Sequence, residues 1–135
     1  MNKSVILDSS AIISLTFSDD SNHKRAIDIS KNLNQENSVL VLPGEIITET
    51  LNVIGKKIGK EKQLLVGKDL LESSEYIIFE TDEQVRQNAF IKLHNTANTV
   101  SYTDCIVMAI ADYFNSSYIF GFDHAFVTNG YTLVY

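Results

Sequence analysis

The stretch that decides the fold is Ser4-Val5-Ile6-Leu7-Asp8-Ser9-Ser10-Ala11-Ile12-Ile13. Its apolar residues 5–7 predict a short buried strand, and the polar residues 8–10 favour the start of a helix. Asp8 then stands at the carboxyl end of a strand, which is where open α/β sheets bind their ligands. This one stretch predicts a strand, an acidic residue at its end and a helix that follows directly.

The rest of the chain continues the alternation of strands and helices. Short apolar runs predict further strands at residues 39–42, 76–79, 118–120 and, more weakly, 132–134. Apolar residues at helical spacing predict helices at residues 19–33, 43–57, 60–71, 82–95 and 101–114. In the helix at 60–71 we expect Leu64, Leu65 and Leu71 to face inward. The fold class is therefore α/β, with a mainly parallel central sheet of four to five strands.

Length and composition fit one domain that covers residues 1–135. The chain is 44% hydrophobic with one proline and one cysteine, so it can bury a core without disulfides, and Cys105 is expected to be a small buried hydrophobe. No run reaches the ~20 apolar residues of a membrane span and no signal peptide is evident, so we expect a cytoplasmic protein with no membrane partner. The net charge of −6 gives no general attraction for nucleic acid unless bound cations change the local sign.

Four acidic residues are candidates for a common site at the sheet edge. Asp8 follows the first strand, Asp123 follows the fourth, Asp104 heads the most apolar helix, and Glu49 lies in the helix after the second strand. Each also has a structural explanation, because Asp8 can cap a helix, Asp104 can close a capping box with Ser101, Glu49 can face solvent and Asp123 can form a turn. Gathered carboxylates repel one another, and a hard divalent cation would neutralise them. Since the histidines show no zinc-like spacing, the set favours Mg²⁺ or Mn²⁺ acting on a phosphate ester.

Four blocks of the sequence resemble, in order, the PIN-domain ribonuclease family. They are SVILDSSAII at 4–13, LPGEIITETLNV at 42–53, SYTDCIVMAIA at 101–111 and IFGFDHAF at 119–126. The resemblance spans nearly the whole chain. It implies a single PIN-like domain whose sheet is covered by helices on both faces. It also implies a Mg²⁺- or Mn²⁺-dependent endoribonuclease of the VapC-like kind found as the toxin of toxin–antitoxin pairs.

The resemblance further implies roles for particular side chains. Asp8 and Asp104 would be the main metal ligands and catalytic acids, and Glu49 and Asp123 would complete the set for one or two metals. Ser9 and Thr103 would be hydroxyls that orient ligands or waters.

Two positions leave alternatives open. Glu45 lies one helical turn before Glu49 and competes for its role, although the family spacing favours Glu49. Gly121 stands where the family commonly has Thr or Ser, two residues before Asp123, which makes Asp123 the least secure member of the set.

Partners follow from the same resemblance. The substrate would be single-stranded or structured RNA, and Lys56, Lys57 and Lys60 are candidates to hold its backbone, although such a run is also an ordinary solvated helix face. A homodimer and an antitoxin are implied, with residues 54–71 as the candidate contact. The alternatives are a non-catalytic PIN-like scaffold that binds RNA or protein, and a Mg-dependent phosphoryl-transfer domain. The sequence leaves open which RNA is cut and whether the protein is a toxin or a processing nuclease.

Overall fold

The computed structural model describes residues 2–135, which form five strands and seven helices. The strands are β1 (Ser4–Leu7), β2 (Val39–Pro43), β3 (Tyr76–Phe79), β4 (Tyr118–Phe120) and β5 (Thr132–Leu133). The helices are α1 (Ser9–Thr16), α2 (His23–Gln35), α3 (Gly44–Lys57), α4 (Lys60–Glu72), α5 (Glu83–His94), α6 (Tyr102–Tyr113) and α7 (Ala125–Thr128).

The strands form one sheet in the order β3-β2-β1-β4-β5, and each of the four adjacent pairs is parallel. β1 is central: Ile6 is in register with Val41 of β2 on one side and Ile119 of β4 on the other. The predicted α/β class is confirmed. With β1 in the middle, Asp8 leaves the sheet at the centre of its carboxyl edge.

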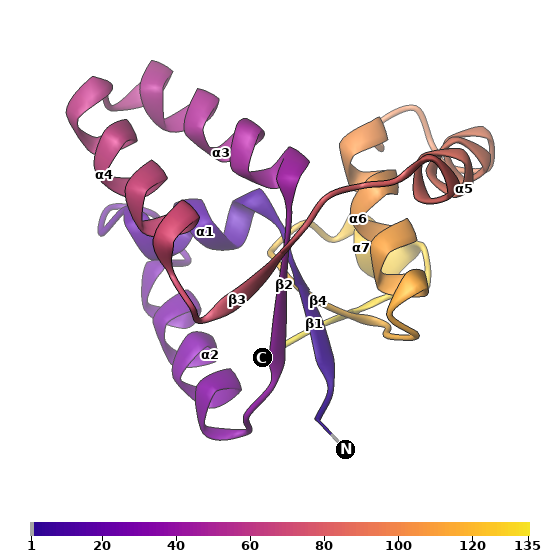
Figure 1. Cartoon of the computed structure of the whole chain (residues 1–135), viewed down its shortest axis with the longest axis horizontal. Helices are drawn as coiled ribbons and strands as arrows, with labels where there is room; N and C mark the ends of the chain where they lie inside the picture. The colour runs from indigo at the N-terminus through magenta and orange to yellow at the C-terminus, as the bar shows by residue number, and fades with distance from the viewer. Residues whose placement is uncertain (1) are drawn as a thin grey trace.

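Helices cover both faces of the sheet (Figure 1). Helices α1 to α4 lie on one side of the sheet, and α5, α6 and α7 lie on the other. The buried centre of the second layer is α6, where all residues from 105 to 111 are buried. This explains why α6 is apolar on nearly every face, since it packs against both β1 and α5.

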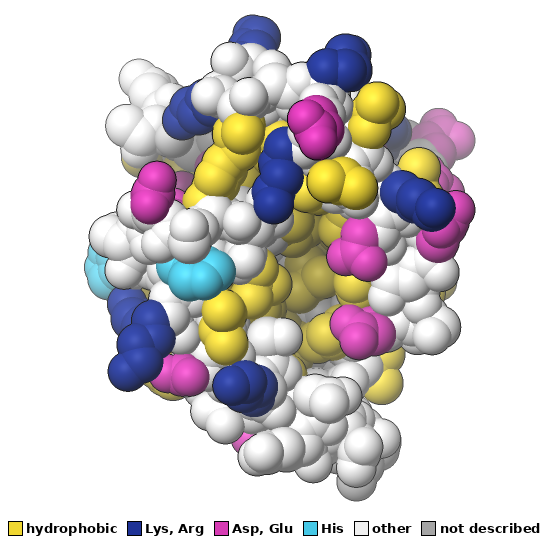
Figure 2. All heavy atoms as spheres, turned by 90° about the vertical axis from the view of Figure 1, so that its left-hand side faces the viewer, with side chains coloured by type: hydrophobic (Ala, Val, Ile, Leu, Met, Phe, Trp, Pro, Cys, Tyr) yellow, Lys and Arg dark blue, Asp and Glu magenta, His cyan; other side chains and the backbone are white. Residues whose placement is uncertain are grey.

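The prediction that the leucines of α4 face inward was wrong. The exposed fractions of Leu64, Leu65 and Leu71 are 64%, 62% and 60%. The helix instead turns Gly67 and Leu70 toward the protein, and the absence of a side chain at Gly67 lets α4 lie close to Leu51 of α3. Figure 2 shows hydrophobic side chains at the surface on this side of the molecule.

Several predicted boundaries also shift. The helix expected from residue 19 begins at His23, because Asp20 accepts hydrogen bonds from the Asn22 N–H and the Ser14 hydroxyl and so stabilises a turn before it. Pro43 ends β2 and caps α3 instead of lying in its first turn. Within residues 2–135, no helix combines the length and hydropathy needed to cross a bilayer.

Candidate active site

Asp8 is a buried carboxylate at the junction of β1 and α1, with an exposed fraction of 5%. Its Oδ2 accepts hydrogen bonds from the Ser10 hydroxyl at 2.6 Å and from the Ser10 N–H at 3.3 Å, which caps α1. Burial raises the pKa of Asp8 above its ordinary value, the bonds from Ser10 oppose this shift, and the charge of Asp104 adds to it. The capping role considered for Asp8 is therefore present, and the same buried carboxylate lies at the carboxyl edge of the sheet near Asp104.

Glu49 lies near Asp8 and Asp104, half-buried on α3. Its pKa is raised, first by burial and then by the charges of Asp8 and Asp104, while a hydrogen bond from Ser9 lowers it. Three carboxylates, from the β1–α1 junction, α3 and α6, thus lie near one another: the charge of Asp104 raises the pKa of Asp8, and both raise the pKa of Glu49. They form what we call the three-acid cluster: Asp8, Glu49 and Asp104.

Asp104 is held at the head of α6 by a capping box. Its Oδ2 accepts the Ser101 N–H at 3.0 Å, and its own N–H donates to the Ser101 hydroxyl at 3.0 Å. The cap satisfies backbone N–H groups that the first turn of a helix leaves without a partner. The capping box considered for Asp104 is therefore present, and the carboxylate that closes it also acts on the pKa of Asp8 and of Glu49.

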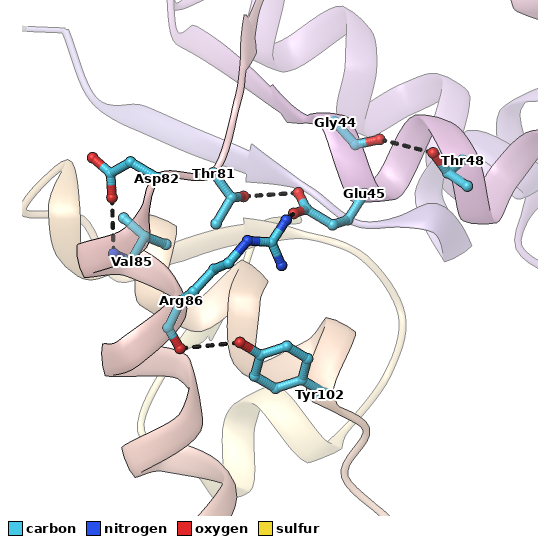
Figure 3. Close-up of polar contacts among 8 residues, drawn as sticks. All are labelled: Gly44, Glu45, Thr48, Thr81, Asp82, Val85, Arg86 and Tyr102. Atoms are coloured by element: carbon cyan, nitrogen blue, oxygen red, sulfur yellow. Dashed lines mark hydrogen bonds and ion pairs between the residues drawn. The ribbon is translucent and has the colours of Figure 1, made fainter.

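The carboxylate of Glu45 is bound by Thr81, just before α5, and by Arg86 of α5 (Figure 3). It accepts a hydrogen bond from the Thr81 hydroxyl at 2.8 Å and pairs with the Arg86 guanidinium at 3.0 Å. The carbonyl of Arg86 in turn accepts the Tyr102 hydroxyl at 3.0 Å. Glu45 therefore ties α3 to α5 at the margin of the site, and Glu49 is the acid of α3 that lies beside Asp8.

Asp123 lies on the exposed turn between β4 and α7, where its Oδ1 accepts the Ala125 N–H at 2.9 Å. This is the turn function considered for it, and its place among the metal ligands stays a prediction. The same turn reaches the cluster through its backbone, because the Phe122 N–H donates to the Ser10 hydroxyl at 3.0 Å.

Gly121 is required by close packing at this point. A Cβ at residue 121 would lie 2.9 Å from Asp8 Cβ, closer than side chains normally approach. Glycine stands here in place of the family's usual Thr or Ser, at a point where the backbone after β4 packs tightly against Asp8. Sequence reasoning missed Ser10, although a hydroxyl two residues after a capping Asp is a familiar partner in such turns.

Two hollows lie along α3, one of them beside Glu49. One is lined by Glu45, Thr48, Glu49, Asn52, Val53 and Thr103, and the other by Asn52, Gly55, Lys56, Lys60 and Gln63. Asn52 borders both, and we call the stretch of surface from Glu49 to Lys56 and Lys60 that they occupy the path on α3. Lys57 lies in the last turn of the same helix and is exposed.

The donor chemistry of the cluster fits a hard divalent cation, because every side chain in it offers carboxylate oxygens that are close enough to repel one another. Asp8, Glu49 and Asp104 are the residues that would hold such an ion. In the structure of residues 2–135, no three His, Cys, Asp or Glu side chains, those of the three-acid cluster included, are yet close enough together to bind one ion. Binding would therefore draw the carboxylates closer together.

Comparisons with known proteins agree with this architecture. A sequence profile of the PIN domain family matches residues 5–129, while no curated protein matches the chain significantly. Among solved structures, VapC20 from Mycobacterium tuberculosis, described as a sarcin–ricin loop cleaving toxin, is similar with a TM-score of 0.82 at 18% identity, covering 95% of this chain and 96% of its own. FitAcB from Neisseria gonorrhoeae is similar with a TM-score of 0.63 at 17% identity, covering 96% of this chain and 95% of its own. At these identities the similarity shows a shared fold.

Proposed function

The chain belongs to the PIN domain family, and from this premise we propose that it is an endoribonuclease that requires Mg²⁺ or Mn²⁺ and acts as the toxin of a toxin–antitoxin pair. The observation that carries the proposal is the three-acid cluster, in which Asp8 and Asp104 each raise the pKa of Glu49 at the carboxyl edge of the sheet. Repulsion of this kind destabilises the metal-free fold, and a bound cation relieves it.

Each residue then has a distinct task. Asp8, Glu49 and Asp104 bind the cation, and Asp123 is proposed to complete the set from the neighbouring turn. When bound, the cation supplies charge stabilisation at the scissile phosphate and makes water more acidic. The Ser9 hydroxyl bonds to Glu49 and orients it, and Thr103 borders the same hollow as Glu49.

RNA is proposed to approach along the path on α3. Lys56 and Lys60 offer positive charge at one end of it, and Glu49 lies at the other. Phosphates bound by these lysines would bring the neighbouring backbone toward the acids. The similarity to VapC20, named as a toxin that cleaves a loop, supports a substrate of this class.

The proposal is tested by cleavage of a fluorescently labelled RNA with Mg²⁺, with Mn²⁺ and with EDTA. We expect cleavage only with a metal, and a loss of at least ~100-fold in Asp8→Asn and Asp104→Asn, since each variant removes a charge that acts on the cation. Asparagine retains a side-chain oxygen for the caps of α1 and α6, so circular dichroism should show an intact fold. Cleavage that persists in both variants, or in EDTA, would contradict the proposal.

A protein partner is proposed for the side of the molecule that carries α4. A hollow of about 160 Å³ lies between α1, α2 and α4, lined by apolar side chains that include Ile12, Leu15, Val66 and Leu70. Figure 2 shows hydrophobic side chains in the floor of a hollow on this side. An apolar segment of an antitoxin suits such a surface, and we also propose a homodimer. Co-expression with the product of a neighbouring reading frame should yield a stable complex and suppress RNA cleavage.

The non-catalytic scaffold remains the second candidate, because Gly121 stands two residues before Asp123, where the family commonly has a hydroxyl residue. The same assay separates the two functions: a scaffold would bind RNA without metal-dependent cleavage.

A further inference from the structure

We propose that Ser10 is a positioning residue of the nuclease site, whose hydroxyl fixes the carboxylate of Asp8 and joins it to the turn that carries Asp123. The inference deepens the proposed function and rests on it. Ser10 itself would touch neither the cation nor the RNA and would act through Asp8.

The hydrogen bonds of Ser10 support this role directly. Its hydroxyl donates to Asp8 Oδ2 at 2.6 Å and accepts the Phe122 N–H at 3.0 Å. A serine hydroxyl has one proton, so donation to Asp8 commits that proton and fixes the direction of the bond. A short bond from O–H to a carboxylate is among the stronger neutral–ionic hydrogen bonds. One oxygen atom therefore links the end of β1 to the turn that follows β4, 112 residues later in the chain.

Gly121 packs closely against the Ser10 hydroxyl and the Asp8 carboxylate. A Cβ on Gly121 would lie 3.1 Å from Ser10 Oγ and 3.3 Å from Asp8 Oδ2. The backbone at Gly121, directly after β4, therefore lies against the bond between Ser10 and Asp8. Asp8 Oδ2 is the oxygen that accepts both hydrogen bonds from Ser10.

The positioning role can be separated from helix capping. The N–H of Ser10 donates to Asp8 Oδ2 at 3.3 Å, and this bond survives the removal of the side chain. Ser10→Ala therefore leaves the cap of α1 in place while it frees the carboxylate to rotate and leaves the Phe122 N–H without its acceptor. A residue that mattered only for capping would tolerate this change.

The chain contains a matched control on the same helix. Ser14 is buried, and its hydroxyl donates to Asp20 Oδ1 at 3.0 Å. Ser14→Ala thus removes a bond of the same chemical type from α1, four residues farther along, without touching the three-acid cluster.

The experiment measures Mn²⁺ binding to the RNA-free protein by electron paramagnetic resonance, together with kcat and KM for RNA cleavage. We expect Ser10→Ala to bind Mn²⁺ about 10-fold or more weakly and to lose kcat with little change in KM, which is the size of effect seen when groups behind a metal ligand are removed. Ser10→Thr, which keeps the hydroxyl, should restore both within about threefold. Ser14→Ala should bind Mn²⁺ as the wild type does.

Failure of this proposal differs from failure of the proposed function. Wild-type Mn²⁺ affinity in Ser10→Ala, or equally weak binding in Ser10→Thr, would overturn the positioning role even if RNA is cleaved. Mn²⁺ binding that depends on Ser10 without any RNA cleavage would overturn the nuclease function and leave the positioning of Asp8 supported. A wild-type protein that binds no Mn²⁺ would overturn both. If Ser10→Ala does not fold, Gly121→Ala replaces it, since its Cβ would press on Ser10 Oγ as well as on Asp8 and should weaken Mn²⁺ binding by disturbing the bond between them.

Discussion

Asp8 carries an energetic conflict within one side chain. It is buried, and burial raises its pKa more strongly than the bonds from Ser10 lower it. The folded, metal-free protein therefore holds a proton on Asp8 more tightly than the unfolded chain does. Protonation of Asp8 stabilises the fold, and this contribution is lost as the pH rises through the pKa of the folded state.

The raised pKa of Asp8 predicts how Asp8→Asn behaves in the absence of metal. Asparagine carries no charge to desolvate and still offers an oxygen to Ser10, so the variant should melt above the wild type at neutral pH. A gain of 1 kcal/mol corresponds to ~2–4 °C at roughly this chain length. Thermal melts in EDTA across the acidic to neutral range should show the difference shrinking as the pH falls. If the variant melts below the wild type at neutral pH, the buried charge of Asp8 does not destabilise the metal-free fold.

Sequence reasoning at the residue scale identified Asp8 and Asp104 by their positions but not the bonds around them. An acid at the end of an apolar strand is visible in the sequence. The hydrogen bond from Phe122 to Ser10 joins residues 112 positions apart, and no local pattern predicts it. The same holds for Gly121, whose close approach to Asp8 depends on the register of β4 against β1.

Helices α3 and α5 are joined by the pair of Glu45 and Arg86. The pair is partly exposed, and such pairs contribute ~0.2–1 kcal/mol each to stability. Glu45 was the competitor of Glu49 in the sequence because both lie on one face of α3. The structure distinguishes them by their partners: Glu45 pairs with Arg86, whereas Glu49 lies near Asp8. The sequence does not reveal the first pair, because Arg86 lies 41 residues beyond Glu45 in the chain.

The different partners of these acids lead to a paired prediction. Glu45→Gln should retain RNA cleavage within about threefold and lower the melting temperature by at most a few degrees. Glu49→Gln should lose at least ~100-fold in cleavage, because it removes a charge from the three-acid cluster. Equal losses in the two variants would show that Glu45 also serves the site. Cleavage rates and melting curves of both variants provide the measurement.

The periodicity of α4 illustrates what a helical pattern leaves undetermined. Apolar residues at helical spacing predict a helix correctly, and α4 begins at Lys60 as expected. The pattern does not say which side of the helix meets the protein. The structure shows that Gly67 and Leu70 meet the protein, with Gly67 beside Leu51 of α3, while Leu64 and Leu65 face outward.

The whole molecule is acidic, although its proposed substrate is a nucleic acid with the same sign of charge. Its net charge is −6, so RNA binding must depend on local concentrations of positive charge. The path on α3 provides one, with Lys56 and Lys60 around a common hollow. At this scale the sequence predicted the alternating fold and the sheet edge that carries the acids. It could not show that Asn52 borders both hollows, because the second hollow depends on how α4 packs on α3.

Charge reversal tests the path. The double variant Lys56→Glu and Lys60→Glu should weaken RNA binding ~10-fold at low salt and make its dependence on salt concentration shallower by a slope of about 1–2. The double variant Lys24→Glu and Lys31→Glu is the matched control, since both are exposed lysines of α2, on no surface assigned to RNA. Fluorescence anisotropy at several salt concentrations, in EDTA to prevent cleavage, measures both quantities. An unchanged slope in the double variant would remove these lysines from the RNA path.

The buried thiol of α6 has a practical consequence. Cys105 is the only cysteine in the sequence, it has an exposed fraction of 0%, and burial raises the pKa of its thiol. A thiol reagent can reach it only when α6 opens, so the labelling rate reports how often this helix separates from its neighbours. Because Cys105 directly follows Asp104, the labelling rate of its thiol also reports how often the N-terminal part of α6 opens near the three-acid cluster. A cation that draws the acids together should lower this labelling rate, even when no substrate is present.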